Sequence, residues 1–218
     1  MDKKSLRREY LRIRAGLSAY TRGKADQAII RTVEGLAEFR NAGIVAGYVT
    51  DGTEPDVLPL IRKALKKGRR ACLPKWNGNE YILSFVDEED LATLAPGKWG
   101  LMEPVSTRPA EEYIPAGNVL FLVPGVAFDD GLNRLGRGGG IYVRILNGRG
   151  CATALGIFYE CQQCLVLPTE RHDVRLDLIV TEAAVRRCEK QASAAAGAEP
   201  GAGRQMPESS VNEMREIL

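Results

Sequence analysis

Apolar positions along the chain form two kinds of pattern, and the first is typical of strands. Residues 119–123 read Val-Leu-Phe-Leu-Val, a run without polar alternation that indicates a strand buried on both faces of a parallel sheet. The segment 81–86 alternates instead, and we expect it in a small additional β layer. Further short apolar segments predict strands at residues 43–50, 71–74, 153–159 and 176–180.

The second kind of pattern has the period of a helix. In the first segment the apolar side chains recur four, three and four positions apart, as on one helix face, at Leu6, Tyr10, Ile13 and Leu17. Ser18 is a suitable N-cap for a second helix that reaches about Phe39. Strands that alternate with helices predict an α/β fold, in which a mostly parallel central sheet is flanked by helices in three Rossmann-like layers.

The loop at residues 51–56 follows the first predicted strand. Thr53 as a cap and Pro55 near the first helical position predict a helix that begins here and ends near Lys67. Glu54 therefore lies at the carboxyl end of a strand, where open α/β sheets place their ligand contacts. An equally weighted interpretation is that Glu54 only favours the helix N-terminus.

A glycine-rich loop follows the run Val119–Val123. The strand ends at Pro124, residues 136–140 read Gly-Arg-Gly-Gly-Gly, and an apolar helix is predicted to close at Asn147. Glycines without Cβ atoms let backbone N–H groups approach a phosphate, to which a helix N-terminus adds partial positive charge. Full charges are available from Arg134, Arg137 and Arg144. The alternative is a plain tight turn that binds nothing, because adjacent glycines suit a tight turn as well as a phosphate site.

Basic residues of the first predicted helix fall into two sets. At about 100° per residue, Lys3, Arg7 and Arg14 lie on a stripe beside the apolar face, whereas Arg8 and Arg12 point away from it. The outward pair is expected to be solvated. The stripe is either ordinary surface or a set of cations that reaches into a cleft and holds an anion.

Both tryptophans lie outside the predicted helices. Trp76 follows the strand at residues 71–74, and Trp99 lies in a loop at residues 91–104. A tryptophan in a loop covers the core in most proteins, but it is also the side chain on which a flat heteroaromatic ring stacks. Both interpretations stay open for Trp99.

Length and composition limit the class of protein. With 218 residues and 44% hydrophobic composition, we expect one domain over residues 1–188 and a flexible Ala/Gly/Ser/Pro-rich tail over residues 189–218. The net charge of +2 and the absence of a long apolar run indicate neither a nucleic-acid partner nor a membrane. The charged start of the chain suits a cytoplasmic protein, and we expect a monomer. The spacing Cys161-x-x-Cys164 has no second pair, so we interpret both as ordinary thiols.

A set of ordered motifs resembles one known family. Residues 124–129 (PGVAFD) and 134–140 (RLGRGGG), with Tyr142 and Arg144, resemble the signature of the 5-formyltetrahydrofolate cyclo-ligase family, also called methenyltetrahydrofolate synthetase. The resemblance covers about residues 1–185, and the other matching segments are Lys3-x-x-Leu6-Arg7, 48–54, Glu103-Pro104, Gln162, 168–173, Asp177 and Thr181-Glu182.

The resemblance implies an ATP-dependent ligase that converts 5-formyltetrahydrofolate to 5,10-methenyltetrahydrofolate and releases ADP and phosphate. By similarity, ATP would be held by Lys3, Arg7, Arg134, Leu135, Gly136, Arg137, Gly138, Gly139, Gly140, Ile141 and Tyr142. The reduced folate would contact Val49, Glu54, Trp76, Trp99, Arg137, Gly138, Gly139, Gly140 and Ile141. Catalytic roles would fall to Glu54, Arg137 and Arg144.

Two positions depart from the family pattern. Family members read aromatic-Tyr-Asp-Arg after the glycines, where this chain has Ile141-Tyr142-Val143-Arg144. The missing aspartate is a Mg²⁺ ligand in the family, and valine cannot coordinate a cation that requires oxygen. Asp173 matches the second metal carboxylate. The resemblance therefore implies a Mg²⁺ site that keeps one of its two carboxylates.

Three functions are compatible with these residues. The first is an active ATP-dependent cyclo-ligase. The second is a homologue that binds nucleotide or folate but has impaired catalysis, because Val143 and Ile141 replace family residues. The third, a phosphate-rich RNA ligand, has no RNA-binding motif to support it.

Overall fold

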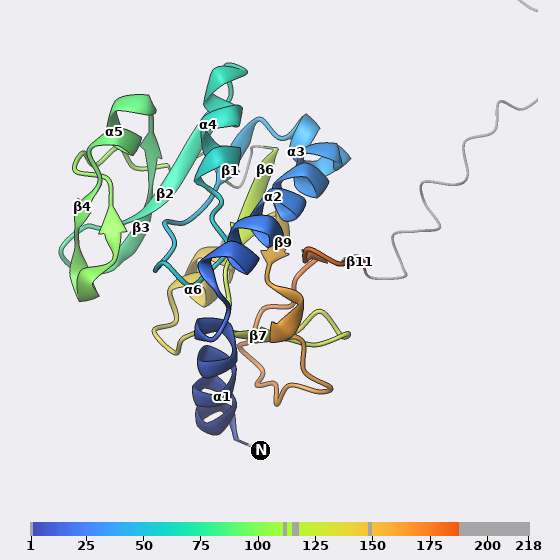
Figure 1. Cartoon of the computed structure of the whole chain (residues 1–218). Helices are drawn as coiled ribbons and strands as arrows, with labels where there is room; N and C mark the ends of the chain where they lie inside the picture. Colours follow the sequence, from blue (N-terminus) through green and yellow to red (C-terminus); the bar gives the residue numbers. More distant parts are fainter. Residues whose placement is uncertain (1, 111–112, 115–117, 148–149, 188–218) are drawn as a thin grey trace, which may run out of the picture. The chain divides into compact units, whose positions relative to one another are not determined.

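The structure, a computed structural model, describes residues 2–110, 113–114, 118–147 and 150–187 of the chain. Its main feature is a seven-stranded sheet in the order β11-β10-β9-β6-β1-β2-β3 (Figure 1). The inner strands pair in parallel, whereas β3 and β11 pair antiparallel at the two edges. The strands are Ile44–Ala46 (β1), Arg70–Trp76 (β2), Tyr81–Val86 (β3), Val119–Val123 (β6), Thr153–Ile157 (β9), Leu178–Val180 (β10) and Val185–Arg187 (β11). The predicted mostly parallel sheet is confirmed.

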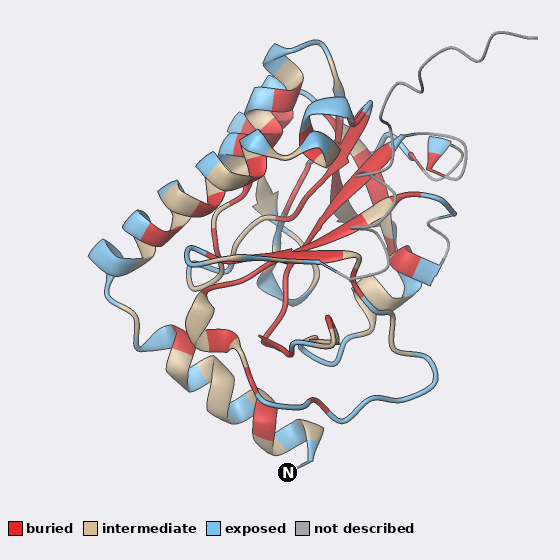
Figure 2. Cartoon of the chain, turned by 90° about the vertical axis from the view of Figure 1, so that its right-hand side faces the viewer, coloured by how far each residue is buried: buried red, intermediate tan, exposed pale blue. Residues whose placement is uncertain are grey.

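Strand β6 is covered by helices on both faces, as its unbroken apolar run predicts. All its residues are buried, and successive side chains point to opposite faces. Leu120 and Leu122 pack with residues of two helices, whereas Phe121 packs on the other side with Leu146 of a third helix. These helices are Ala19–Gly35 (α2), Leu58–Lys66 (α4) and Ile141–Asn147 (α6). Figure 2 shows the buried strands between their covering helices, which is the predicted three-layer α/β fold.

The first part of the chain forms three helices where the sequence predicts two. Helix α1 (Lys3–Ala15) follows the predicted segment, and the Ser18 side chain caps α2 by accepting the N–H of Thr21 at 3.0 Å. The predicted second helix is interrupted at Leu36, whose backbone is extended (φ −70°, ψ 139°). A short helix, Ala37–Asn41 (α3), then buries Phe39.

Helix α4 begins later than predicted, at Leu58. The reason lies in the Asp51 side chain, whose Oδ1 accepts hydrogen bonds from the N–H groups of Thr53 at 2.8 Å and Glu54 at 3.0 Å. These bonds form a local turn of the kind that aspartate favours. The assignment of Thr53 as a helix cap was therefore wrong, and Pro55 lies in the loop.

The additional β structure exists, but its membership differs from the prediction. The segment 81–86 does not belong to it, because β3 pairs with β2 at the edge of the main sheet. The first strand is also shorter than predicted, and the edge strand β11 was not predicted. Two small sheets pair β4 (Ala95–Pro96) with β5 (Met102–Glu103) and β7 (Ala127–Phe128) with β8 (Arg134–Leu135). The remaining short helices are Glu88–Ala92 (α5), Lys98–Gly100 (η1) and Glu160–Gln162 (η3).

Three further expectations concern the tail, the thiols and the membrane. The predicted tail lies outside the described residues, so the division at residue 188 stays a prediction. Cys161 and Cys164 are free, and burial raises the pKa of both thiols, which suits unreactive side chains. Among the described residues, no helix has the length and apolar character needed to cross a bilayer.

Strand β9 contains a glycine that the packing requires. A methyl group at Gly156 would lie 2.5 Å from Leu176 Cδ1 and 2.7 Å from Phe158 Cε2, so Gly156→Ala forces the core apart. We expect the free energy of unfolding in urea to fall by about 1–3 kcal/mol. Gly23→Ala in α2, where a methyl group meets nothing within 4 Å, is the matched control and should gain about 0.5–1 kcal/mol. Equal stability of the two variants would contradict this packing.

Candidate active site

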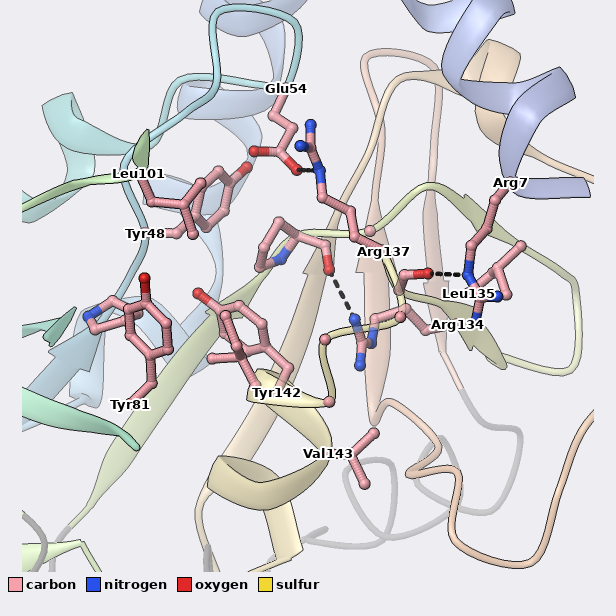
Figure 3. A pocket seen from close by; sticks show the side chains of 18 of the residues that line it. Arg7, Tyr48, Glu54, Tyr81, Leu101, Arg134, Leu135, Arg137, Tyr142 and Val143 are labelled. Carbon is pink, nitrogen blue, oxygen red and sulfur yellow. Dashed lines mark hydrogen bonds and ion pairs between the residues drawn. The ribbon is translucent and has the colours of Figure 1, made fainter. Parts of the chain in front are cut away.

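A cavity of about 940 Å³ lies where several loops from the sheet meet α1 (Figure 3). Its size is within the range of small-molecule sites. Loops that follow β1 and β6 contribute to it, which agrees with the rule that ligands bind at the carboxyl ends of parallel strands. The lining segments are 2–4 with Arg7, 48–49 with Glu54, Pro74 with Tyr81, Trp99 with 101–103, 124–125, 134–143, Glu170 and 172–173.

The glycine loop forms one wall of the cavity, and two of its positions require glycine. Gly138 has φ of 101° and Gly140 has φ of 67°, in the left-handed region that side chains disfavour. Gly139 lies beside the Trp99 ring, with about van der Waals room for a methyl group (3.7 Å). Helix α6 begins directly after this loop, at Ile141, and has seven residues. The full positive charges at this wall come from the side chains of Arg134 and Arg137.

Four of the predicted cations line the cavity: Lys3 and Arg7 from α1, and Arg134 and Arg137 from the segment 134–137. Arg7 Nε donates to Gly136 O at 2.8 Å, and Arg134 Nη1 donates to Pro124 O at 3.2 Å, so both guanidinium groups are anchored on loop carbonyls. Burial lowers the pKa of Arg134. Lys3 Nζ forms ion pairs with Glu170 at 2.8 Å and Asp173 at 2.7 Å. Of the basic stripe predicted from the sequence, Lys3 and Arg7 thus line the cavity, whereas Arg14 is fully buried and does not.

Asp173 is the predicted metal carboxylate, and it is paired with Lys3. Its Oδ2 also accepts the N–H of Glu170 at 2.8 Å. Burial alone would raise the pKa of Asp173, but the hydrogen bonds from Lys3 and Glu170 outweigh it and hold the pKa below its usual range. For Lys3, burial opposes the charged form, yet the two carboxylates raise its pKa. A cation at Asp173 would have to compete with the Lys3 ammonium group.

The donor set at Asp173 fits Mg²⁺ only in part. Val143 lines the same cavity with an apolar side chain, as its sequence position predicts. Within the described ranges, no group of three or more His, Cys, Asp or Glu side chains could hold a metal ion. Mg²⁺ commonly binds one or two carboxylates together with phosphates and waters. Asp173 therefore suits an ion that arrives with a nucleotide, and these residues form no complete metal cage.

Glu54 points into the cavity from the loop after β1. Its side chain is 9% exposed and lies 3.4 Å from Arg14 Nη1 and 3.6 Å from Arg137 Nε. Burial raises the pKa of Glu54, and the charge of Arg14 and its hydrogen bond oppose that rise. Figure 3 shows Glu54 and Arg137 pointing toward one another, with a dashed line that marks their ion pair. Because Thr53 is not a helix cap and α4 starts at Leu58, the interpretation of Glu54 as a helix-start residue loses its basis.

Aromatic side chains form a second wall of the cavity, which adjoins the glycine loop at Trp99 and Gly139. Trp99 is 63% exposed with a positive φ of 59°, and its ring centroid lies 5.7 Å from that of Tyr81. Trp76 lies behind, 6.3 Å from Trp99, and it is not among the cavity-lining residues. Lys98 Nζ lies 3.2 Å from the Trp76 ring centroid and so occupies one of its faces. A flat ligand therefore has access to the exposed Trp99 ring, whereas Tyr81 lines the cavity with 4% exposure and Trp76 supports this wall.

The cavity brings together nearly all the site residues expected from the sequence. Arg144 is the exception besides Trp76: it is exposed, and its Nη2 donates to Gly139 O at 3.3 Å, so it braces the loop from outside. The expected residues that line the cavity are Lys3, Arg7, Val49, Glu54, Trp99, Arg134, Leu135, Gly136, Arg137, Gly138, Gly139, Gly140, Ile141, Tyr142 and Asp173.

Several lining residues were missed by the sequence reasoning. Tyr48 adjoins the predicted Val49, so its place at the end of β1 was a usable signal. Glu103 belongs to a segment that matches the family, but it was given no site role; its buried carboxylate accepts hydrogen bonds from Lys75 Nζ and the Trp76 N–H, both at 3.0 Å. These partners depend on the packing of β5 against β2 of the main sheet, which local sequence does not reveal. The other missed residues include Tyr81, Leu101, Met102, Glu170 and His172.

Comparisons with known proteins agree with this site. The NMR structure of 5,10-methenyltetrahydrofolate synthetase from Aquifex aeolicus is 34% identical, with a TM-score of 0.74 over 95% of this chain and 97% of that one. A 5,10-methenyltetrahydrofolate synthetase from Mycoplasma pneumoniae is 27% identical, with a TM-score of 0.63 over 84% of this chain and 99% of that one.

Sequence comparison gives the same result. The 5-formyltetrahydrofolate cyclo-ligase of Haemophilus influenzae is 30% identical over 82% of this chain and 97% of its own length. The pattern that defines the 5-formyltetrahydrofolate cyclo-ligase family matches residues 1–182, which include every lining residue of the cavity. The chain therefore belongs to the 5-formyltetrahydrofolate cyclo-ligase family.

Proposed function

We propose that this protein converts 5-formyltetrahydrofolate to 5,10-methenyltetrahydrofolate at the expense of ATP, with ADP and phosphate as the other products. One observation carries the proposal: a single cavity joins the cationic glycine loop to Glu54 and to an exposed aromatic wall. The cationic glycine loop suits a polyphosphate, and the aromatic wall suits a flat reduced pterin. The reaction requires these two ligands to meet. The names of the relatives support the same activity.

The reaction has two steps in this proposal. The formyl oxygen attacks the γ-phosphorus of ATP, the bond to the bridging oxygen breaks, and ADP leaves. The neighbouring ring-closing nitrogen, N10, then attacks the activated formyl carbon, loses its proton, and phosphate departs with the former formyl oxygen. Neither step needs a protein nucleophile, so positioning and charge neutralisation must supply the rate enhancement.

The cations along α1 and the glycine loop suit the first step. Lys3, Arg7, Arg134 and Arg137 line the cavity and present positive charge to a phosphate chain. Preorganised charges in a partly buried site stabilise a transition state without reorganisation of solvent. Mg²⁺, held by Asp173 and the nucleotide, would neutralise further phosphate charge.

Glu54 suits the second step. The product carries a positive charge delocalised over the new amidinium group, and a buried carboxylate beside the reacting carbon stabilises that charge as it forms. The proposal is tested by measuring ADP in the presence and absence of 5-formyltetrahydrofolate. We expect folate-dependent ADP formation with one ADP for each methenyl product. Folate-independent ADP release would indicate an ATPase instead.

Val143 gives a separate test of the metal site. If its apolar side chain leaves Asp173 as the one carboxylate for Mg²⁺, activity in the parent should require high Mg²⁺, and Val143→Asp should lower that requirement and raise kcat. Val143→Asn is the matched control, since it has similar size without the charge. A stability loss of about 1–3 kcal/mol is expected for the aspartate in the absence of metal, where it is half-buried. Unchanged Mg²⁺ dependence with good turnover in the parent would mean that another group supplies the contact.

A further inference from the structure

Arg14 is a buried cation that the proposed reaction does not yet use. Its side chain is 0% exposed, and it is not among the cavity-lining residues, although Lys3 and Arg7 of the same helix are. A fully buried guanidinium group carries a large desolvation cost that its ion pairs and hydrogen bonds must offset. In Arg14 both Nη atoms have such partners, whereas Nε has none among the described residues. Its partners therefore indicate what it is for.

Those partners come from two loops that build the cavity. Arg14 Nη1 donates to Gly125 O at 3.1 Å and to Glu54 Oε1 at 3.4 Å, while Nη2 donates to Asp51 Oδ2 at 3.0 Å. The planar fork of donors lets one side chain hold both carboxylates and a carbonyl at once. Arg14 thus joins α1 to the loop after β1 and to the loop after β6.

A second arginine approaches the same two carboxylates from the cavity. Arg137 pairs with Asp51 and lies 3.6 Å from Glu54, but its side chain is 46% exposed and it belongs to the glycine loop. An anionic ligand at this loop competes with Asp51 and Glu54 for Arg137. Arg14 has no access to such a ligand, so it remains paired with Glu54 when Arg137 is drawn away.

The surroundings of Glu54 show why a fixed cation matters. Within the described ranges, the charged and titratable groups that face it are Arg14, Arg137, Tyr48 and Tyr142, together with the Asp51 carboxylate, which shares both arginines with Glu54. Burial raises the pKa of Glu54, and Arg14 opposes this through its charge and hydrogen bond. Without Arg14, a buried carboxylate beside two tyrosines would take up a proton more readily and would lose its orienting contact.

We propose that Arg14 is a positioning residue that holds Glu54 ionised and directed into the cavity, so that Glu54 acts on the folate. The inference rests on the proposed function, because it assumes that the Glu54 carboxylate takes part in turnover. A purely structural ion pair is the competing explanation. The two explanations differ in the pKa of Glu54 and in the pH profile of activity that they predict for an Arg14 variant that still folds.

The test is a ¹³C NMR titration of the Glu54 carboxyl group in the full chain, assigned with Glu54→Gln, together with the pH profile of kcat/KM. In Arg14→Gln we expect the pKa of Glu54 to rise by about 1–2 units, since an adjacent opposite charge shifts a carboxyl pKa by about 1–3 units. Activity should then be lost at a correspondingly higher pH as the solution is acidified. Arg14→Lys retains the charge but not the fork, and a smaller rise of about half a unit is expected.

Arg12→Gln is the matched control, because Arg12 lies on the same helix and is exposed. It should leave both the Glu54 pKa and the pH profile unchanged. An unchanged pKa of Glu54 in Arg14→Gln, or in Arg14→Lys if the first variant fails to fold, overturns the proposal. If the pKa rises while the pH profile stays fixed, Arg14 still holds Glu54, and it is the role of Glu54 in the proposed function that fails.

Discussion

Glu54→Gln is expected to lower kcat/KM by about 10²–10³-fold, the usual cost of removing one preorganised electrostatic group from an active site. The amide keeps the size of the side chain and an oxygen that can accept from Arg14, so the geometry of the loop should survive. What it loses is the negative charge that faces the forming amidinium group. The measurement is steady-state kinetics with both substrates varied, combined with urea unfolding.

Stability should change little in Glu54→Gln, by about 1 kcal/mol or less in either direction. The pKa of Glu54 is raised in the folded protein, which means that folding favours the neutral form of this side chain over the charged one. A neutral isostere therefore removes an unfavourable burial of charge and partly offsets the lost ion pair. Glu88→Gln, at an exposed pair with Arg62, is the control and should retain full activity. Equal kcat/KM in the parent and in Glu54→Gln would mean that Glu54 takes no part in the reaction.

Neutralising Lys3 or Arg7 is expected to weaken ATP binding by about 1–3 kcal/mol, or about 5–150-fold, with a smaller effect on folate. Lys3→Gln should be the more damaging of the two. It removes a cation and also leaves Asp173 and Glu170 uncompensated at the edge of the cavity, where they repel phosphate. In Arg7→Gln the loss is limited to one cation and its hydrogen bond to Gly136 O.

Arg8→Gln is the matched control for these variants, because Arg8 is an exposed arginine on the same helix. Titration calorimetry with a non-hydrolysable ATP analogue separates binding from turnover. If both Lys3→Gln and Arg7→Gln bind the ATP analogue as tightly as the parent, the basic stripe is ordinary surface and does not hold the phosphates. An equal loss for folate and nucleotide would mean that the helix supports the cavity as a whole and does not hold the phosphates.

The features that the sequence predicted well are those encoded by local patterns. The apolar run at Val119–Val123 predicted a strand buried on both faces, because a strand without polar positions has no face that is suited to contact with water. Gly138 and Gly140 mark a loop with left-handed backbone, which few other residues tolerate. The stripe of Lys3 and Arg7 follows from helix period alone.

The features that were missed depend on strand order and on side chains distant in the sequence. The alternating pattern of Tyr81–Val86 suits either a separate layer or an edge strand, and only its pairing with β2 decides. The helix start near Thr53 failed because Asp51 turns the loop back on itself. Arg14 was identified as a cation beside the core, but its partners Asp51 and Glu54 lie about 40 positions away, so the sequence could not reveal that it holds a carboxylate and not a ligand.

In the proposed function, one cavity brings ATP and 5-formyltetrahydrofolate together for ring closure. The most direct measurement follows the absorbance of 5,10-methenyltetrahydrofolate when the purified full chain is mixed with 5-formyltetrahydrofolate, ATP and increasing Mg²⁺. Methenyl product that forms only with both substrates, and in a one-to-one ratio with ADP, is the predicted result. Tight binding of ATP and folate with no methenyl product at any Mg²⁺ concentration would contradict the claim and identify a binding protein on a cyclo-ligase fold.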